Sequence, residues 1–356
     1  MYLSDYARVG AIYYLTMICD EIVAPSSDYA VMLMIFYIII TWLEMLEQKE
    51  ESIVPYCLLC VAGVYTLTLK LTAGLILLLL LKPAIYLIKN KCWKQIGIYL
   101  LLGLVVAAPW MIRSVLVSGW LIYPLPALDL FSVDWKMPAE YIYYDVAQIQ
   151  TWGRALYSIA AADLPITQWF GNWFLTTLSG TEKLLIIGDI AALAVGVMAA
   201  IVTFLRRKWA NLDILLVLCT VGCSYLYWQY SAPLMRYGYA YVLLLLILTM
   251  GWLLSSFKKL DGFVRAAVLL FGVYKLVAVI QCAMACSLLP NYVWQVDYAT
   301  YELQENDVQG YTVYTPLYGD RSGYHAFPSV PVVNPIELRG EDLSDGFRRI
   351  YGTDVK

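Results

Sequence analysis

The sequence has very little histidine and few charged residues. Among its 356 residues the only histidine is His325, and Asp, Glu, Lys and Arg together make up 14% of the chain. Zinc sites and the Ser-His-Asp and Cys-His catalytic groups rely on imidazole, so a single histidine argues against all of them. Any catalysis by this chain is therefore expected to use carboxylates, Lys, Arg or Tyr.

The shortage of charge also argues against a soluble protein. Hydrophobic residues account for 61% of the chain and the mean hydropathy is +0.67, which leaves too few polar side chains to cover a globular surface. The net charge of −3 gives no reason to expect a nucleic-acid partner. The composition predicts an all-α polytopic protein whose partner is the lipid bilayer.

Cysteine and processing signals add little. Three cysteine pairs lie inside apolar runs, at Cys57 and Cys60, Cys219 and Cys223, and Cys282 and Cys286. The CLLC spacing is compatible with a metal or redox site, but a small apolar side chain in a lipid-facing helix is the favoured interpretation. The start MYLSDYAR is followed by a short apolar stretch without a small-residue cleavage site, so no signal peptide is expected.

Long apolar runs dominate the first four fifths of the chain. A bilayer crossing needs about 20 mostly apolar residues, and this criterion predicts about nine transmembrane helices. The expected spans are 8–23, 29–46, 53–69, 71–88, 96–112, 184–205, 212–230, 238–257 and 263–287. The third and fourth are separated only by Lys70, which predicts a tight hairpin.

The basic residues indicate how the spans are oriented. Short loops on one side of the predicted membrane collect eleven Lys and Arg residues, whereas those on the other side hold only Lys70 and Arg236. Cytoplasmic loops are enriched in Lys and Arg. The amino terminus is thus expected in the cytoplasm, and the carboxyl terminus outside the cytoplasmic membrane.

Two regions lie outside under this topology. Residues 1–287 form the predicted membrane domain, with a large aromatic outer loop at 113–183 that includes an interfacial helix around ITQWFGNWF. Residues 288–356 have the composition of soluble protein and are expected to form a small mixed α/β tail, with a strand in YTVYTPLY.

Three cations are expected at one membrane depth. Lys70 lies in the predicted hairpin, Arg113 follows APWMI at the outer end of the fifth span, and Arg236 lies in SAPLMRYGYA. Each alone is compatible with snorkelling to the headgroups, but together they predict a shared anion site. Asp189, one turn into its span, is expected to pair with one of them.

Carboxylates accumulate on the same side. Asp28 and Asp134 are the best placed candidates for a general base, which must lie close to a cation cluster that holds phosphate. Helix N-capping with Ser26 or Ser27 is an equally good interpretation of Asp28. No cofactor is predicted, although Asp20, Glu21 and Asp28 leave room for a divalent metal.

Several of these segments together resemble a known group of proteins. The run PWMIRSVLVSGWLIYP is similar to the PW-x-x-R-N-x-x-x-x-G-N-P-x-Y-P signature of bacterial GT-C superfamily membrane glycosyltransferases. It matches at Pro109, Trp110, Arg113, Gly119, Tyr123 and Pro124. The segments SSDYAVMLMIFYI, TLTLKLTAG, PALDLFSVDWKMP, APLMRYGYAY and GDRSGYHAFPSVPVVNPIELRG resemble one poorly characterised branch of that superfamily.

The resemblance implies transfer of a sugar from a polyprenyl-phosphate carrier to a surface polysaccharide or glycolipid on the outer face. Lys70, Arg113 and Arg236 would then hold the lipid phosphate. Sugar or carrier would stack on Trp110, Trp120, Trp135 and Trp152.

The chain departs from that family in one respect. Members of the family have further spans before the SSDY segment and a catalytic acidic residue among them, so a fragment, a truncated gene product or an inactive relative is expected. Two other functions remain open: a non-catalytic membrane subunit, and a transporter or flippase-like component of a surface-polysaccharide pathway. The lack of an internal repeat disfavours a transporter.

Overall fold

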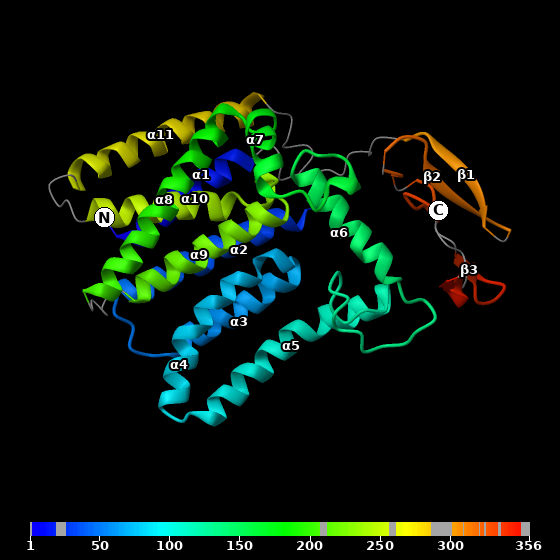
Figure 1. Cartoon of the computed structure of the whole chain (residues 1–356), viewed down its shortest axis with the longest axis horizontal. Coiled ribbons are helices and arrows are strands. Elements are labelled where there is room, and N and C mark those ends of the chain that lie inside the picture. Colours follow the sequence, from blue (N-terminus) through cyan, green and yellow to red (C-terminus); the bar gives the residue numbers. More distant parts are fainter. Residues whose placement is uncertain are drawn as a thin grey trace. The chain divides into compact units, whose positions relative to one another are not determined.

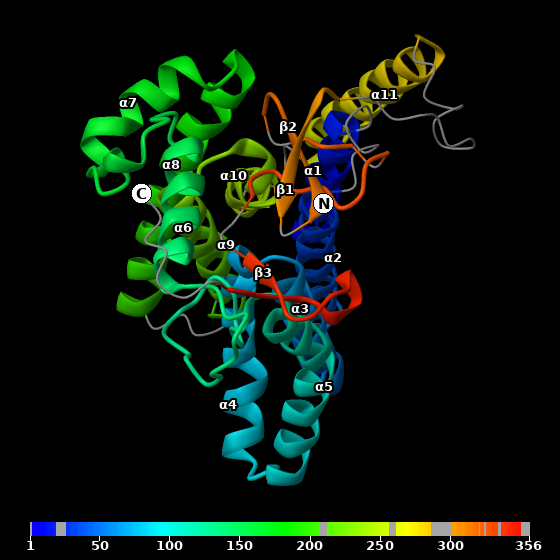
Figure 2. The ribbon, with the colours of Figure 1, turned by 90° about the vertical axis from the view of Figure 1, so that its right-hand side faces the viewer.

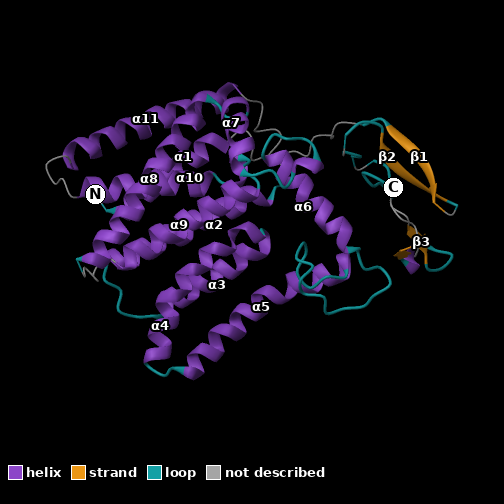
Figure 3. Ribbon diagram, viewed as in Figure 1, coloured by secondary structure: helices purple, strands orange, loops and turns teal. Residues whose placement is uncertain are grey.

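A computed structural model describes residues 2–18, 26–206, 212–255, 261–285, 301–308, 310–319, 321–323, 325–333 and 336–349. The elements are mostly helices (Figures 1 and 3). The longer helices are α1 (Leu3–Ile18), α2 (Ser27–Glu47), α3 (Val54–Leu69), α4 (Leu81–Lys89), α5 (Trp93–Ser118), α6 (Ala139–Gly153), α7 (Ile166–Thr176), α8 (Gly180–Leu205), α9 (Leu212–Ser231), α10 (Tyr239–Ser255) and α11 (Asp261–Ala285), with a 3-10 helix η1 (Leu71–Leu80) ahead of α4.

The chain forms two compact units. The first comprises Met1–Trp110 and Tyr144–Cys286, and the second comprises Met111–Tyr143 and Ser287–Lys356. The first unit contains most of the helices. Helix α10 is at its centre and packs against α1, α2, α8 and α9 (Figure 1). Its residues 240–245 are all buried, as expected for a helix that is apolar on every face.

Six helical segments of the described residues are long and apolar enough to cross a membrane. They are Ser27–Glu47, Leu71–Lys89, Trp93–Ser118, Gly180–Leu205, Leu212–Ser231 and Gly262–Gln281. The chain is a multi-pass membrane protein. Helices α3 and α10 are shorter apolar helices, and α1 has 16 residues, so nine crossings remain a prediction.

The predicted hairpin at Lys70 is confirmed. Helix α3 ends at Leu69 and η1 begins at Leu71, with Lys70 alone between them in extended conformation. A Cβ added to Gly74 would come within 2.8 Å of the Leu67 side chain, which shows that the two arms of the hairpin lie very close to each other. From Leu81 the same span continues as α4, which runs beside the first part of α5 (Figure 2).

The segment ITQWFGNWF forms α7, so the predicted helix is present, and two of its aromatic rings lie inside the first unit. Trp169 is 1% exposed and Trp173 is fully buried in the core of the first unit. The small polar residues between the rings form the exposed face of this helix, and its position at a membrane interface remains a prediction. On its buried face α7 meets α9, with Trp173 and Trp228 in edge-to-face contact.

The second unit combines an irregular loop with strands. Strands β1 (Leu303–Val308) and β2 (Tyr311–Pro316) form an antiparallel hairpin, and β3 (Ile336–Leu338) and β4 (Phe347–Arg349) also pair antiparallel. The strand expected in YTVYTPLY is β2. Helix α5 continues through Pro109 to Ser118, so the loop expected to begin at Arg113 starts later.

Candidate functional site

A buried carboxylate between two cations is the main candidate site of the first unit. Asp28, on the first turn of α2, forms an ion pair with Lys70 through Oδ1, and its Oδ2 lies 3.6 Å from Nε of Arg236. Ser26 is the N-cap of α2 and donates a hydrogen bond to Asp28 Oδ2 over 3.0 Å. Because Ser26 caps the helix, the carboxylate of Asp28 is left free to pair with the cations.

The cluster opens to its surroundings mainly at Arg236. The side chain of Asp28 is 9% exposed and that of Lys70 18%, whereas that of Arg236 is 58% exposed. Among the described residues, two cations and one carboxylate leave one net positive charge, so an anion would approach from the side of Arg236.

Tyr237 completes the cluster beside the two cations. The Lys70 ammonium lies 3.2 Å from the centroid of the Tyr237 ring, and Arg236 donates a hydrogen bond to the Tyr237 hydroxyl over 3.0 Å. Burial lowers the pKa of Lys70, and the neighbouring Arg236 lowers it further, while the hydrogen bond and the charge of Asp28 oppose the shift.

Tryptophans hold the connection that carries Arg236. Between α9 and α10, residues 232–234 leave the helical conformation, and their carbonyls need other donors. The indole of Trp173 donates to the Pro233 carbonyl and that of Trp228 to the Leu234 carbonyl, both over 2.9 Å. The backbone before Arg236 is thereby fixed by two rigid, buried rings.

Arg154 fixes the start of the same connection. Its guanidinium donates to the carbonyls of Ala162 and Tyr230, each over 2.6 Å, and lies 5.1 Å from the ring of Trp169. Helix α6 ends at Gly153, where a Cβ would come within 2.9 Å of the Ala232 backbone. This close approach requires glycine and ties α6 to the end of α9.

Comparison with known proteins places the chain in a family. A family model described as a domain of unknown function, DUF8201, matches residues 2–243. The chain belongs to that family. No curated protein and no solved structure matches it. Asp28, Lys70 and Arg236 all lie within the DUF8201 region, whereas α11 and the tail lie beyond it.

The other predicted phosphate ligand of this DUF8201 chain, Arg113, belongs to the second unit. It is exposed and lies inside α5 rather than on an unwound backbone. Trp110 is the last residue of the first segment of the first unit, Met1–Trp110, and its side chain is half-buried. Of the three predicted cations, the structure brings Lys70 and Arg236 to one carboxylate.

The second predicted base, Asp134, has a partner of its own within the second unit. Its carboxylate accepts hydrogen bonds from Arg339 Nη2 over 2.8 Å and Nε over 3.2 Å. The same guanidinium lies 4.9 Å from the ring of Trp135, whose indole donates to the Val115 carbonyl over 3.4 Å. Asp28 has a serine hydroxyl and two cations around its oxygens, so of the two predicted bases it is the one that lies in a cluster of cations.

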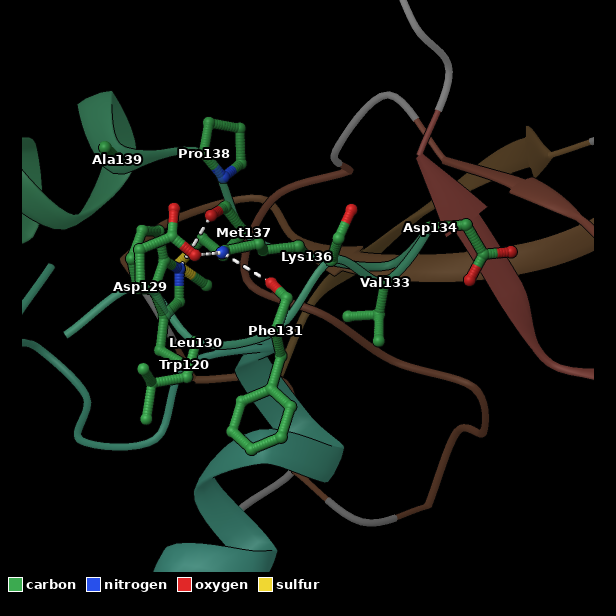
Figure 4. A pocket seen from close by; sticks show the side chains of 11 residues that line it. Trp120, Asp129, Leu130, Phe131, Val133, Asp134, Lys136, Met137, Pro138 and Ala139 are labelled. Carbon is green, nitrogen blue, oxygen red and sulfur yellow. Dashed lines mark hydrogen bonds and ion pairs between the residues drawn. The ribbon is translucent and has the colours of Figure 1, made fainter.

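A cavity of about 520 Å³ in the second unit is lined by Trp120, by residues 129–134 and by residues 136–139 (Figure 4). The Lys136 ammonium pairs with Asp129, donates to the Phe131 carbonyl over 2.7 Å, and lies 4.1 Å from the Trp120 ring. Trp120 is 4% exposed and donates to the Met137 carbonyl, so its ring has little surface left for a sugar.

Gly119 explains how this loop closes. Its φ is +77°, and a Cβ at this position would come within 2.8 Å of the Lys136 backbone, so a larger residue is excluded on both grounds. The fourth predicted stacking residue, Trp152, lies in the first unit at the end of α6. It is 60% exposed and makes an edge-to-face contact with Tyr157.

The prediction that Asp189 pairs with an outer cation is wrong. Asp189 is fully buried within α8, and neither carboxylate oxygen has a hydrogen-bond partner among the described residues. The residue of α8 at the level of the α10 start is Glu182, which accepts from the Tyr239 hydroxyl over 2.6 Å. Asp189 lies seven residues further on, about 10 Å deeper along the helix axis.

Two other lysines have neighbours in the structure. Lys82 forms an ion pair with Asp213 over 2.8 Å and lies 4.5 Å from the Tyr56 ring. Lys275 of α11, for which the sequence predicts no position, lies 4.5 Å from the ring of Tyr13. Within the described residues no group of three or more His, Cys, Asp or Glu side chains is arranged to hold a metal, and Asp20 and Glu21 lie outside those residues.

The residues that position the cluster were not among those predicted from the sequence. Tyr237 directly follows Arg236 in APLMRYGY. An aromatic residue next to a cation favours a cation–π contact, so this neighbour could have indicated a role for Tyr237. Trp173, Trp228 and Arg154 act through backbone carbonyls of other segments, and no local pattern predicts such contacts.

Proposed function

We propose that this chain carries a membrane-embedded site that transfers a sugar from a polyprenyl-phosphate carrier to a surface polysaccharide or glycolipid acceptor. The observation that supports it is the buried Asp28 carboxylate held between Lys70 and Arg236, with one net positive charge accessible at Arg236. The site combines a proton acceptor with cations suited to phosphate.

In the proposed reaction the acceptor hydroxyl oxygen attacks the anomeric carbon of the carrier-linked sugar. The bond between that carbon and the phosphate oxygen breaks, and its electron pair leaves with the polyprenyl phosphate. The hydroxyl proton passes to the Asp28 carboxylate. Lys70 and Arg236 stabilise the charge that develops on the departing phosphate, which is the type of electrostatic contribution that lowers a barrier most.

The test separates binding from transfer. Purified protein in lipid nanodiscs is incubated with a set of polyprenyl-phosphate hexoses and a mixture of polysaccharide and glycolipid acceptors to measure transfer, and with sugar-free polyprenyl phosphate to measure binding. Asp28→Asn is expected to slow transfer by roughly 10²- to 10⁴-fold, the usual contribution of a general base. The same variant is expected to bind polyprenyl phosphate more tightly, because removing the carboxylate charge raises the net charge of the cluster.

Arg236→Gln is expected to weaken polyprenyl-phosphate binding about tenfold, equivalent to about 1.4 kcal/mol. Glu51→Gln, an exposed carboxylate in the connection before α3, is the control and should leave both readouts unchanged. Undiminished transfer by Asp28→Asn contradicts the proposal. Tight carrier binding by the wild type without transfer from any donor would favour the flippase-like alternative, for which the unpartnered Asp189 inside α8 is the supporting observation among the described residues.

A further inference from the structure

A second cavity in the first unit lies away from the Asp28 cluster. It has a volume of about 610 Å³ and lies between α4, α8, α9 and α10. We refer to it as the α8–α9 groove. On α8 it is lined by Ala192, Gly196 and Ala200, which are spaced four residues apart and therefore share one face of the helix. A Cβ on Gly196 would meet nothing within 4 Å, so the groove is open along this face.

The groove is apolar along its length and polar at one end. The Lys82–Asp213 ion pair forms that end, with side-chain exposures of 22% and 47%. The opposite end is lined by Leu226 on α9 and Ala192 on α8. A site with a charged end and an apolar length has the polarity of an amphiphile.

One buried polar atom in the groove lacks a partner. Thr249 lines the groove, is 2% exposed, and its hydroxyl has no hydrogen-bond partner among the described residues. Helices α9 and α10 run antiparallel, and Leu245 of α10 lies beside Gly222 of α9. Thr249, one turn after Leu245 on α10, is therefore closer than Leu245 to the Asp213 end of the groove. An unsatisfied buried hydroxyl costs about 1–3 kcal/mol, which a ligand carbonyl would relieve.

The groove is long enough to hold an acyl chain that crosses one bilayer leaflet. From Asp213 to Leu226 the groove follows α9 for about 20 Å at 1.5 Å per residue. One leaflet contributes about half of the ~30 Å hydrocarbon core. Lys82 follows Lys70 by twelve residues along η1 and α4, on the order of 20 Å from the Asp28 cluster, so the two sites are separate.

We propose that the α8–α9 groove binds a glycerophospholipid with a zwitterionic primary-amine headgroup. One acyl chain lies along Ala192, Gly196 and Ala200, and the ester carbonyl accepts a hydrogen bond from Thr249. The lipid phosphate binds Lys82 and the lipid ammonium binds Asp213. A purely anionic headgroup would leave its phosphate facing Asp213 without compensation, and a quaternary ammonium has no hydrogen to donate to that carboxylate.

The experiment is native mass spectrometry of the whole protein, stripped of lipid in detergent and then titrated with phosphatidylethanolamine, phosphatidylglycerol, phosphatidylcholine or polyprenyl phosphate. One molecule of phosphatidylethanolamine per chain is expected to bind at least about fivefold more tightly than the other phospholipids, a difference of about 1 kcal/mol. Gly196→Leu, which places a side chain in the open groove, and the double variant Lys82→Ala/Asp213→Ala are each expected to remove that preference.

Matched controls make the result independent of folding. Gly97→Leu, at an exposed glycine of α5 that also has nothing within 4 Å of its Cβ, should retain phosphatidylethanolamine binding. Lys89→Ala removes an exposed lysine from α4 and should also retain it. Equal binding of the three phospholipids, tighter binding of polyprenyl phosphate at this groove, or unchanged binding by Gly196→Leu would overturn the proposal. None of these outcomes depends on sugar transfer.

Discussion

The first unit buries two carboxylates in opposite electrostatic surroundings. Asp28 lies on the first turn of α2 with Lys70, Arg236 and Ser26 around its oxygens. Asp189 lies in the third turn of α8 with no partner among the described residues. A buried charge is tolerated when it is paired and is expensive when it is not. The comparison shows that the position of a carboxylate along its helix decides whether cations at the helix ends can reach it.

The largest expected effect is on the paired carboxylate. Asp28→Leu leaves the partly buried Lys70 without its counter-ion, and removing one partner of a buried pair costs up to about 3–5 kcal/mol. The variant should unfold at a clearly lower temperature in detergent, as followed by intrinsic fluorescence. If Asp28→Leu melts with the wild type, the ion cluster contributes nothing to the fold and the contrast with Asp189 disappears.

The sequence allowed part of this site to be predicted, for a physical reason. Lys70, Asp28 and Arg236 all lie in or beside short connections between apolar runs, and hydropathy alone locates such connections at the ends of the helices. Hydropathy does not show which helix ends lie next to one another in the fold. Arg113 follows an apolar run just as Lys70 does, yet α5 continues past it as helix.

Burial of aromatic residues was the least predictable feature. Tryptophans of α7 alternate with polar residues just as those of an interfacial helix do, but Trp173 packs against Trp228 and donates to the Pro233 carbonyl. The indole hydrogen bond joins residues that are 60 positions apart in the chain. A single sequence carries no signal for such a pairing, whereas the hairpin at Lys70 is dictated by chain connectivity.

The rigidity of the Arg236 connection can be tested at Gly238. A Cβ there would come within 2.3 Å of the Trp228 ring, a buried neighbour that cannot move freely. Gly238→Ala is therefore expected to destabilise the protein by about 1–3 kcal/mol and to weaken polyprenyl-phosphate binding by displacing Arg236. Gly171→Ala on α7, where nothing lies within 4 Å, is the control and should leave thermal stability and binding near wild type. Wild-type binding by Gly238→Ala would show that Arg236 does not depend on this packing.

The paired cluster is also expected to respond to alkaline pH. The pKa of Lys70 lies below its usual value of 10.5, so in the window just below pH 10.5 the folded protein has released a proton that the unfolded chain still holds. The free energy of unfolding therefore rises with pH across that window relative to a variant that cannot lose its charge. Phosphate binding falls over the same window, because the ammonium is lost.

Lys70→Arg keeps its charge at every accessible pH. Its polyprenyl-phosphate binding should persist to higher pH than that of the wild type, as measured by titrating binding upward from about pH 7 in steps of about half a unit through the usual lysine range. Identical alkaline limits for wild type and Lys70→Arg would mean that Lys70 does not contact the phosphate.

The smallest effect is expected at the unpartnered carboxylate. Asp189 accepts no hydrogen bond from the described residues, so Asp189→Asn removes no ion pair among them, and the shape of the side chain is kept. Asparagine keeps the size of the side chain and replaces one buried polar group without a partner by another, so the free energy of unfolding is expected to change by less than about 1 kcal/mol. If Asp189→Asn lowered the free energy of unfolding as much as Asp28→Leu does, Asp189 would have a partner. Both carboxylates would then be paired buried charges. A transport role for Asp189 predicts instead that stability is unchanged while movement of carrier lipid between leaflets is lost, which separates that alternative from sugar transfer at Asp28.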